Sequence, residues 1–338
     1  MKKWHYPFLA FLIIGSYFVL TESRRESGVT GGKMEYRKAS GLVFGTSYNV
    51  TYLADHDLEP ELLAAMNCVD SALSMFNPAS TISKVNMAHD TITVTDSMFL
   101  EVMRLAMKVS DLTHGAFDIT VAPAVNAWGF GFKNSVPISQ NTVDSLREIV
   151  GYSKIHERNG LIVKDDNRIM LDCSAIAKGY GSDMAARALR ENGCSNFMVE
   201  IGGEVVVSGL NPHGTPWNIG ISKPVDDTLS ANNDIDTIIC ITDIGMATSG
   251  NYRNFYIKDG RKVAHTIDPF TCTPVSHSLL SATVLAPTCA YADALATSMM
   301  VMGLDSARAL VPRLPGVRAF LIFEDSDGTM RTEEVPER

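Results

Sequence analysis

The chain has 338 residues, of which 46% are hydrophobic and 20% are charged, so it holds enough apolar material for a large soluble core. One large domain or two fused halves would both fit this length. The formal net charge of −9 and the sequence pI of about 5.4 argue against a broad affinity for nucleic acid phosphates. An anionic ligand would need local help from a cation or from helix N-termini.

The N-terminal residues have the order of an export signal. Two lysines precede an apolar run from Phe8 to Leu20, and charged residues begin at Glu22. Because no A-x-A-like cleavage site is evident and no cysteine follows to accept a lipid, we favour a signal anchor in the inner membrane over 1–22. A cleaved signal peptide is the alternative, and a buried globular helix is the third interpretation. Both export readings place Ser23 onward on the periplasmic side.

The remaining chain is predicted to be a polar tether, 23–40, followed by one folded domain, 41–338. The domain begins with a strand or hairpin arm over 41–54, rich in β-branched and aromatic residues. Helical spacing of apolar residues predicts helices over 59–76 and 97–115, the second stopped by Gly115.

The middle and last third interleave strands and helices without a regular βαβ period. Strands are predicted over 168–174, 196–209, 216–222, 237–250, 253–260, 277–287 and 317–328, and helices over 177–193, 289–303 and 304–314. This order favours an α+β fold with mixed or antiparallel sheets and packed helices. Six cysteines, without a CxxC pair or zinc spacing, are expected to be mostly buried apolar fillers whose pairing the sequence does not determine.

Asp293 and Thr297 are the first candidates for chemistry. They are four residues apart in "CAYADALATSMMVMG", so a helix brings both oxygens to one face, as a hard cation such as Mg²⁺ requires. The structural alternative is strong, because an aspartate near a helix start and a mid-helix threonine usually serve the helix itself.

Three further stretches carry polar groups. In "LDCSAIAKGYGSDMAARAL", Asp172 is predicted to end a strand and Lys178 to sit in the first turn of the next helix, where a phosphate could bind; a plain strand-to-helix turn is the alternative. The stretch 115–131 is too rich in glycine and proline for a regular element, and could hold a flat ring or be a satellite apolar cluster. His265 is a candidate general base, although a lone histidine is more often structural.

Seven blocks, in order, resemble the signatures of the ApbE-type FAD:protein FMN transferases. They are "MFNPASTISKVN", "GAFDITVAPAVNAWGFG", "LDCSAIAKGYGSDMAARAL", "VEIGGEVVVSG", "ATSGNYRNF", "HTIDPFTCTPV" and "YADALATSMMVMG". The resemblance covers about Gly41 to Leu304. It implies a T-fold-like architecture, FAD as substrate, Mg²⁺ as cofactor, and transfer of FMN to a threonine hydroxyl of an exported acceptor protein with release of AMP.

The same resemblance implies roles for individual residues. It makes Asp293 and Thr297 side-chain metal ligands and Ala175 a ligand through its carbonyl. The positions matching FAD contacts are Phe44, Phe76, Ala116, Phe117, Asp118, Asp172, Lys178 and Ile267. His265 matches the histidine that we assign as the base for the acceptor threonine.

The chain departs from the family pattern in three places. Cys272 stands where glycine is usual, so the turn after Asp268 is expected to be altered, and Ala296 replaces an aspartate found in some relatives. The lipid-accepting cysteine of many relatives is absent. Two other functions remain open, namely an Mg²⁺-dependent FAD pyrophosphatase giving FMN and AMP, and a non-catalytic extracytoplasmic FAD-binding protein.

Overall fold

The computed structural model describes residues 33–131, 138–224, 234–251, 255–258 and 261–337. The predicted signal segment 1–22 lies outside these residues. Within the described part of the chain, no helix is both long and apolar enough to cross a membrane.

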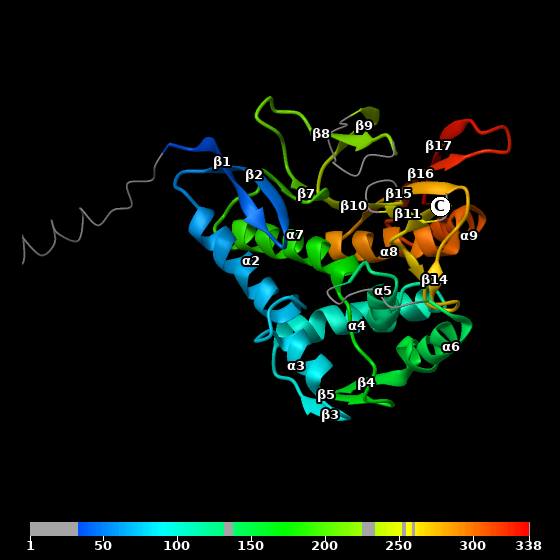
Figure 1. Ribbon diagram of the computed structural model, residues 1–338. Coiled ribbons are helices and arrows are strands. Elements are labelled where there is room, and N and C mark those ends of the chain that lie inside the picture. The colour runs from blue at the N-terminus through cyan, green and yellow to red at the C-terminus, as the bar shows by residue number, and fades with distance from the viewer. Residues whose placement is uncertain (1–32, 132–137, 225–233, 252–254, 259–260, 338) are drawn as a thin grey trace, which may run out of the picture.

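An eight-stranded sheet forms the framework, with the order β1-β2-β6-β7-β10-β15-β16-β17 and every neighbouring pair antiparallel (Figure 1). Its strands are β1 (Glu35–Val43), β2 (Thr46–Ala54), β6 (Phe197–Ile201), β7 (Glu204–Ser208), β10 (Ile244–Gly250), β15 (Leu279–Ala286), β16 (Arg318–Glu324) and β17 (Met330–Val335). Strands that are distant in sequence become neighbours, such as β2 with β6 and β10 with β15.

Two helices, α7 (Ser174–Glu191) and α8 (Cys289–Met302), lie against one face of this sheet. The hairpin of β8 (Trp217–Ser222) and β9 (Ile235–Ile241) covers the other face, where Trp217 and Ile219 pack on Val207 and Ile322. Side chains alternate between the two faces of each strand, so the apolar cluster under this hairpin is separate from the one that faces the helices. Almost the whole circumference of α8 is buried.

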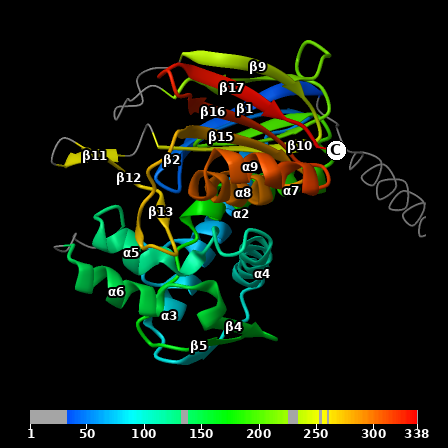
Figure 2. The same cartoon turned by 90° about the vertical axis from the view of Figure 1, so that its right-hand side faces the viewer.

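The second layer is mainly helical and lies on the far side of α7 and α8 from the sheet (Figure 2). It holds α3 (Thr81–Met87), α4 (Ser97–Leu112), the short η1 (Ile119–Val121), α5 (Ala122–Ala127), α6 (Gln140–Ile149), η2 (Tyr152–Lys154), and a small sheet of β3 (Thr91–Thr93), β5 (Leu161–Lys164) and β4 (Ile155–Arg158). α2 (Glu59–Leu73) runs between the layers: Leu62 and Met66 in its first half pack on the large sheet beside α7, and its last turn joins the core shared with the helical layer. The remaining elements are the hairpins β11 (Phe255–Lys258)–β12 (Arg261–Ala264) and β13 (Ile267–Asp268)–β14 (Thr273–Pro274), and, after α8, the short helices α9 (Leu304–Leu310) and η3 (Val311–Arg313).

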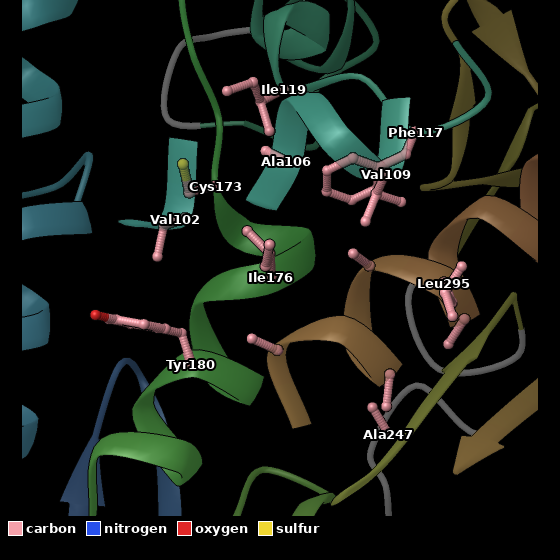
Figure 3. Close-up of a cluster of buried hydrophobic side chains, with 14 of the residues drawn as sticks. Val102, Ala106, Val109, Phe117, Ile119, Cys173, Ile176, Tyr180, Ala247 and Leu295 are labelled. Carbon is pink, nitrogen blue, oxygen red and sulfur yellow. The ribbon is translucent and has the colours of Figure 1, made fainter. Parts of the chain in front are cut away.

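A continuous apolar core joins the two layers. Figure 3 shows side chains of α4, α7 and α8 meeting around it, with Val102, Ala106, Val109, Ile176, Tyr180 and Leu295 among them. Phe117 and Ile119, from the segment after α4, fill the same cluster. The burial of Phe117 and Ile119 thus fixes the first residues of the segment that follows α4.

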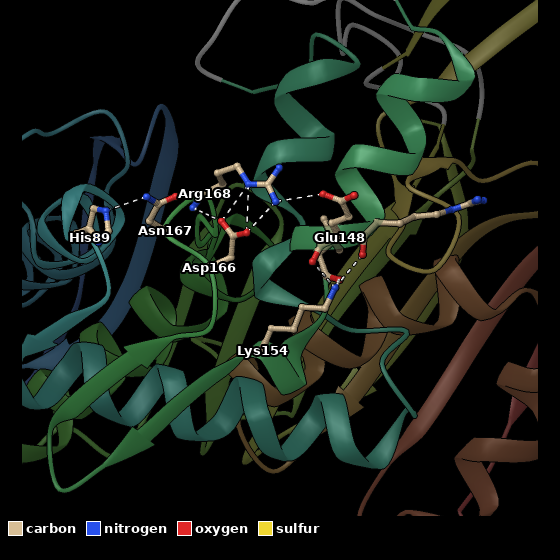
Figure 4. A network of polar contacts seen from close by, with 8 residues as sticks. His89, Glu148, Lys154, Asp166, Asn167 and Arg168 are labelled. Carbon is tan, nitrogen blue, oxygen red and sulfur yellow. Dashed lines mark hydrogen bonds and ion pairs between the residues drawn. The ribbon is translucent and has the colours of Figure 1, made fainter.

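Polar contacts fasten the outer edge of the helical layer (Figure 4). The ammonium of Lys154 donates to the carbonyls of Arg147, Glu148 and Val150, which are the last acceptors of α6. Arg168 pairs with Asp166 and with Glu148. The segment between β5 and α7 is therefore held against the end of α6, a few residues before α7 begins.

The α+β prediction is confirmed, and three local predictions are wrong. Residues 168–174 form no strand, and the Leu171 backbone pairs instead with the Asn86 side chain at 2.7 and 2.9 Å. The stretch 115–131 contains α5, because Pro123 suits the first turn of a helix. Residues 35–40 belong to β1 and not to a tether, since β2 pairs with them along their length.

The cysteine prediction is confirmed in most positions. Cys173, Cys194, Cys272 and Cys289 are buried, whereas Cys68 and Cys240 are exposed, and all six are free thiols.

Candidate functional site

A cavity of about 530 Å³ opens where the sheet, the helical layer and the β13–β14 hairpin meet. All of the site residues predicted from the sequence line it except Phe44. Its walls come from separate parts of the chain, with ranges 116–121, 172–178, 202–204, 246–250, 265–269 and 293–301 contributing residues. This volume is within the range of small-molecule and cofactor sites.

The predicted metal ligands lie where α7 and α8 touch. A β-carbon at Gly179 would lie 2.5 Å from the carbonyl oxygen of Cys289 and 2.8 Å from the Asp293 β-carbon, so only glycine allows this approach. The Gly179 amide donates to Oδ2 of Asp293 at 3.0 Å. Ala175 stands one turn before Gly179, and Thr297 one turn after Asp293. The glycine's role was missed, although "AKGYG" within a helix was its signal.

The donor set fits a hard cation. A carboxylate, a hydroxyl and a backbone carbonyl are the oxygen ligands that Mg²⁺ prefers, and all three residues line the cavity. Among the described residues there is no group of three or more His, Cys, Asp or Glu side chains that could hold a metal. Asp293 is the one carboxylate in the proposed set. Burial raises the pKa of Asp293, while nearby Lys178 and the Gly179 amide lower it.

Lys178 stands at the cavity wall, paired with a residue that the sequence did not single out. Its Nζ lies 2.9 Å from Oε1 of Glu204, the first residue of β7. Burial lowers the pKa of Lys178, but the carboxylates of Asp293 and Glu204 outweigh burial and raise it. The position of Lys178 differs from the prediction, since α7 begins at Ser174 and the lysine is past its first turn.

Asp172 and Asp118 use their carboxylates on the backbone. Asp172 Oδ1 accepts from the Ser174 amide at 2.7 Å at the start of α7, and Asp172 ends no strand. Asp118 Oδ1 accepts from the amide and hydroxyl of Thr120, and its Oδ2 accepts from the Tyr152 amide at 2.6 Å. Burial raises the pKa of both carboxyls, and these hydrogen bonds oppose that rise. Both carboxylates therefore hold the cavity wall in shape.

The aromatic residues divide between two places. Phe117 is buried beside Val109 in the core, so it and Ala116 form a fixed part of the wall (Figure 3). Phe76 is 79% exposed and lines both this cavity and a second, mostly apolar one of about 530 Å³. Phe44 lines only the second cavity, where its ring lies over Gly181.

His265 and Ile267 approach from the hairpin side. The His265 ring lies edge-on to that of Phe130, with centroids 6.3 Å apart. The turn behind them contains Cys272 at φ 52, its amide donating to the Asp268 carbonyl at 2.8 Å and its carbonyl accepting from the Trp128 indole at 2.9 Å. The backbone here takes the left-handed conformation that glycine favours, which gives a physical reason for the glycine that is usual at this position.

Comparisons with known proteins agree with this arrangement. The model of the ApbE family matches residues 44–321. An FAD:protein FMN transferase of Haemophilus influenzae is 35% identical over 86% of this chain and 87% of its own length, and one of Vibrio cholerae is 36% identical over 86% and 88%.

Solved structures agree as well. The flavin transferase ApbE from Vibrio cholerae superposes with a TM-score of 0.79 at 33% identity, over 89% of this chain and 97% of that one. The apo form of the Pseudomonas stutzeri flavinyl transferase ApbE gives 0.78 at 29% identity, over 89% and 95%. With most of its length matched by the family model and by relatives above 30% identity, the chain belongs to the ApbE family.

Proposed function

We propose that this protein is an FAD:protein FMN transferase, which moves FMN from FAD to a threonine hydroxyl of an acceptor protein and releases AMP. The observation that carries this proposal is that one cavity brings together the metal-type oxygens, a partly exposed lysine and a histidine. The relatives named above carry this activity in their names.

The reaction forms one P–O bond and breaks another. The acceptor hydroxyl attacks the FMN phosphorus, the bond to the AMP phosphate breaks, and an imidazole nitrogen of His265 takes the hydroxyl proton. Lys178, paired with Glu204, would stand beside the phosphates. The wall residues Ala116, Phe117, Asp118, Asp172 and Ile267 hold the nucleotide, with Phe76 and Phe44 toward the second cavity. The rigid wall contributes by orienting the two reacting groups.

Mg²⁺ is the proposed cofactor. Asp293, Thr297 and the Ala175 carbonyl would hold it, and when bound it would neutralise charge on the pyrophosphate. The hard-oxygen donor set on the cavity wall supports this assignment.

Two other functions make different products. If water replaces threonine, the protein is an FAD pyrophosphatase that yields free FMN and AMP. If no bond is broken, it is an FAD-binding protein. Against the latter stands the pairing of Asp293 and Thr297 on one helix face, because storing the ligand alone would not require a metal on its phosphates.

One assay separates the three functions. The purified protein is incubated with FAD, Mg²⁺ and an acceptor domain carrying a serine/threonine-glycine-alanine-threonine-like segment, and the products are identified by mass. FMN bound to the acceptor together with AMP is expected. Free FMN with AMP would identify the hydrolase, and no AMP in any mixture would identify the binder.

Asp293→Ala is expected to lower the turnover rate at least a hundredfold, because it removes the only carboxylate of the proposed ligand set. Circular dichroism and thermal unfolding serve as the folding control. Asp305→Ala is the matched control: this aspartate on α9 has 97% of its side chain exposed and does not line the cavity, so the variant should retain activity. Normal turnover by Asp293→Ala would refute the metal assignment.

We also propose that residues 1–22 anchor the protein in the inner membrane with the folded part in the periplasm. The apolar run from Phe8 to Leu20 behind two lysines supports this placement. Fractionation of cells, followed by N-terminal sequencing of the mature protein, distinguishes an anchor from a cleaved signal.

A further inference from the structure

Glu204 is a buried charge that the proposed reaction leaves without a task. It follows the Gly202–Gly203 turn between β6 and β7, and only 3% of its side chain is exposed. Its Oε1 pairs with Lys178, whereas the buried Oε2 has no hydrogen-bond partner among the residues that the structure describes. Burial raises the pKa of Glu204, and Lys178 opposes this rise. A carboxylate oxygen is costly in such a place, because a buried acceptor without a partner has lost its hydrogen bonds to water and gained none in exchange.

The geometry holds the pair firmly. Lys178 and Ser182 lie four residues apart on one face of α7, and the Ser182 hydroxyl donates to the Glu204 carbonyl at 3.1 Å. The helix therefore grips the start of β7 by both the backbone and the side chain of Glu204. Lys178 keeps 32% of its side chain exposed, and it lines both cavities. Its ammonium can thus meet a ligand while Glu204 stays in place.

The consequence is electrostatic. Burial raises the pKa of Glu204 to about 8, whereas its 2.9 Å contact with Lys178 favours the ionised carboxylate. With both carboxylates ionised, the side chains of Lys178, Glu204 and Asp293 carry one positive and two negative charges and interact with one another. Glu204 offsets the lysine, so the lysine's charge is not free to hold an anionic pyrophosphate by itself. Asp293 remains as the net negative charge that attracts a cation.

We infer that Glu204 couples FAD binding to cation binding: by neutralising Lys178, it makes the phosphates depend on the divalent cation for their positive charge. This inference rests on the proposed function, and it assigns Glu204 as a positioning residue that acts through Lys178. The two ligands whose binding Glu204 would couple are a nucleotide pyrophosphate and a hard divalent cation.

The test is equilibrium binding, without turnover. FAD affinity is measured from the quenching of flavin fluorescence on the full-length protein, once with Mg²⁺ and once with EDTA, and the ratio of the two dissociation constants gives the coupling. In the unmodified protein FAD should bind much more tightly with Mg²⁺. In Glu204→Gln the metal-free affinity should rise about tenfold and the ratio should fall by a similar factor.

The double variant Lys178→Met/Glu204→Gln is decisive. It removes one charge of each sign, so the net charge near Asp293 matches that of the unmodified protein, and the Mg²⁺ dependence should return. A merely structural role for Glu204 would not produce this restoration. The double variant also serves alone if Glu204→Gln does not fold, because a lost Mg²⁺ dependence there would overturn the inference.

Glu157→Gln is the matched control. Glu157 also forms an ion pair at 2.9 Å, with Arg104, and keeps only 12% of its side chain exposed, but it lies away from the cavity. It should leave the ratio unchanged. Equal weakening of FAD binding by Glu204→Gln with and without Mg²⁺ would refute the coupling while leaving the transferase assay untouched. Failure of that assay with intact coupling would instead refute the proposed function.

Discussion

Cys272 occupies a position whose backbone conformation favours glycine. It is fully buried, and its φ of 52 places it in the left-handed region that costs a side chain about 1–2 kcal/mol. The two hydrogen bonds of its backbone, to Asp268 and from Trp128, keep it there. The resemblance indicated glycine at this position, and the conformation gives the physical reason.

Because of this strain, we expect a glycine variant at this position to be more stable than an alanine variant, the reverse of the usual order. Cys272→Gly should leave the protein about 1 kcal/mol more stable than Cys272→Ala, because glycine relieves the left-handed strain and both lose the sulfur. Urea unfolding of the two variants measures the difference.

Cys68, inside α2, is the control for this comparison. A helix interior has ordinary backbone angles, so Cys68→Gly should be about 1 kcal/mol less stable than Cys68→Ala. The same order at both positions would show that the turn at Cys272 carries no strain.

At the scale of elements, the contact between α7 and α8 builds the site. Besides the close approach at Gly179, Asp183 of α7 caps α8: its carboxylate accepts from the amides of Cys289 and Ala290 at 3.0 and 2.9 Å. Carboxylates are favourable at helix N-termini, where the amides are otherwise unpaired. α7 thus fixes where α8 begins and how α8 lies along it, and so sets the position of Asp293 relative to Ala175.

The Asp183 cap predicts a pH dependence of stability. Burial raises the pKa of Asp183 from 3.8 to about 6, with the two amides opposing it. Between these values the folded protein retains a proton that the unfolded chain has lost, so the free energy of unfolding should fall as the pH rises from about 4 to 6. The loss from this group is at most about 3 kcal/mol.

Asp183→Asn should remove this contribution. The difference in unfolding free energy between the variant and the unmodified protein, measured in urea at pH 4.5, 5.5 and 6.5, should therefore shift in favour of the variant as the pH rises. Asp144→Asn, an exposed position on α6, is the control. A difference that is constant across the three pH values would contradict the cap's titration.

At the scale of the whole molecule, the sequence predicted the local parts better than their assembly. The α8 helix, the candidate ligands on it and the His265 region follow from spacing and resemblance. The strand order does not, because β2 meets β6 only across more than a hundred residues of chain. Glu204 was missed for the same reason: its importance comes from Lys178, which only the packing of α7 on β7 brings within reach.

The cavity lies between the two layers, and this placement predicts how a ligand stabilises the protein. Its wall combines 116–121 of the helical layer with 202–204 and 246–250 of the sheet, joined by 172–178. A ligand that contacts all of them links the layers, and one present at a hundredfold excess over its dissociation constant adds about 2.7 kcal/mol to stability.

Hydrogen exchange measures this linkage. FAD with Mg²⁺ should slow exchange of the buried amides in both layers together, by up to about a hundredfold for those that open only by global unfolding. EDTA should reverse most of the effect, and Asp293→Ala should show little response to Mg²⁺. Protection confined to the helical layer would mean that the nucleotide binds without touching the sheet, and the phosphates would then lie away from Lys178 and Asp293.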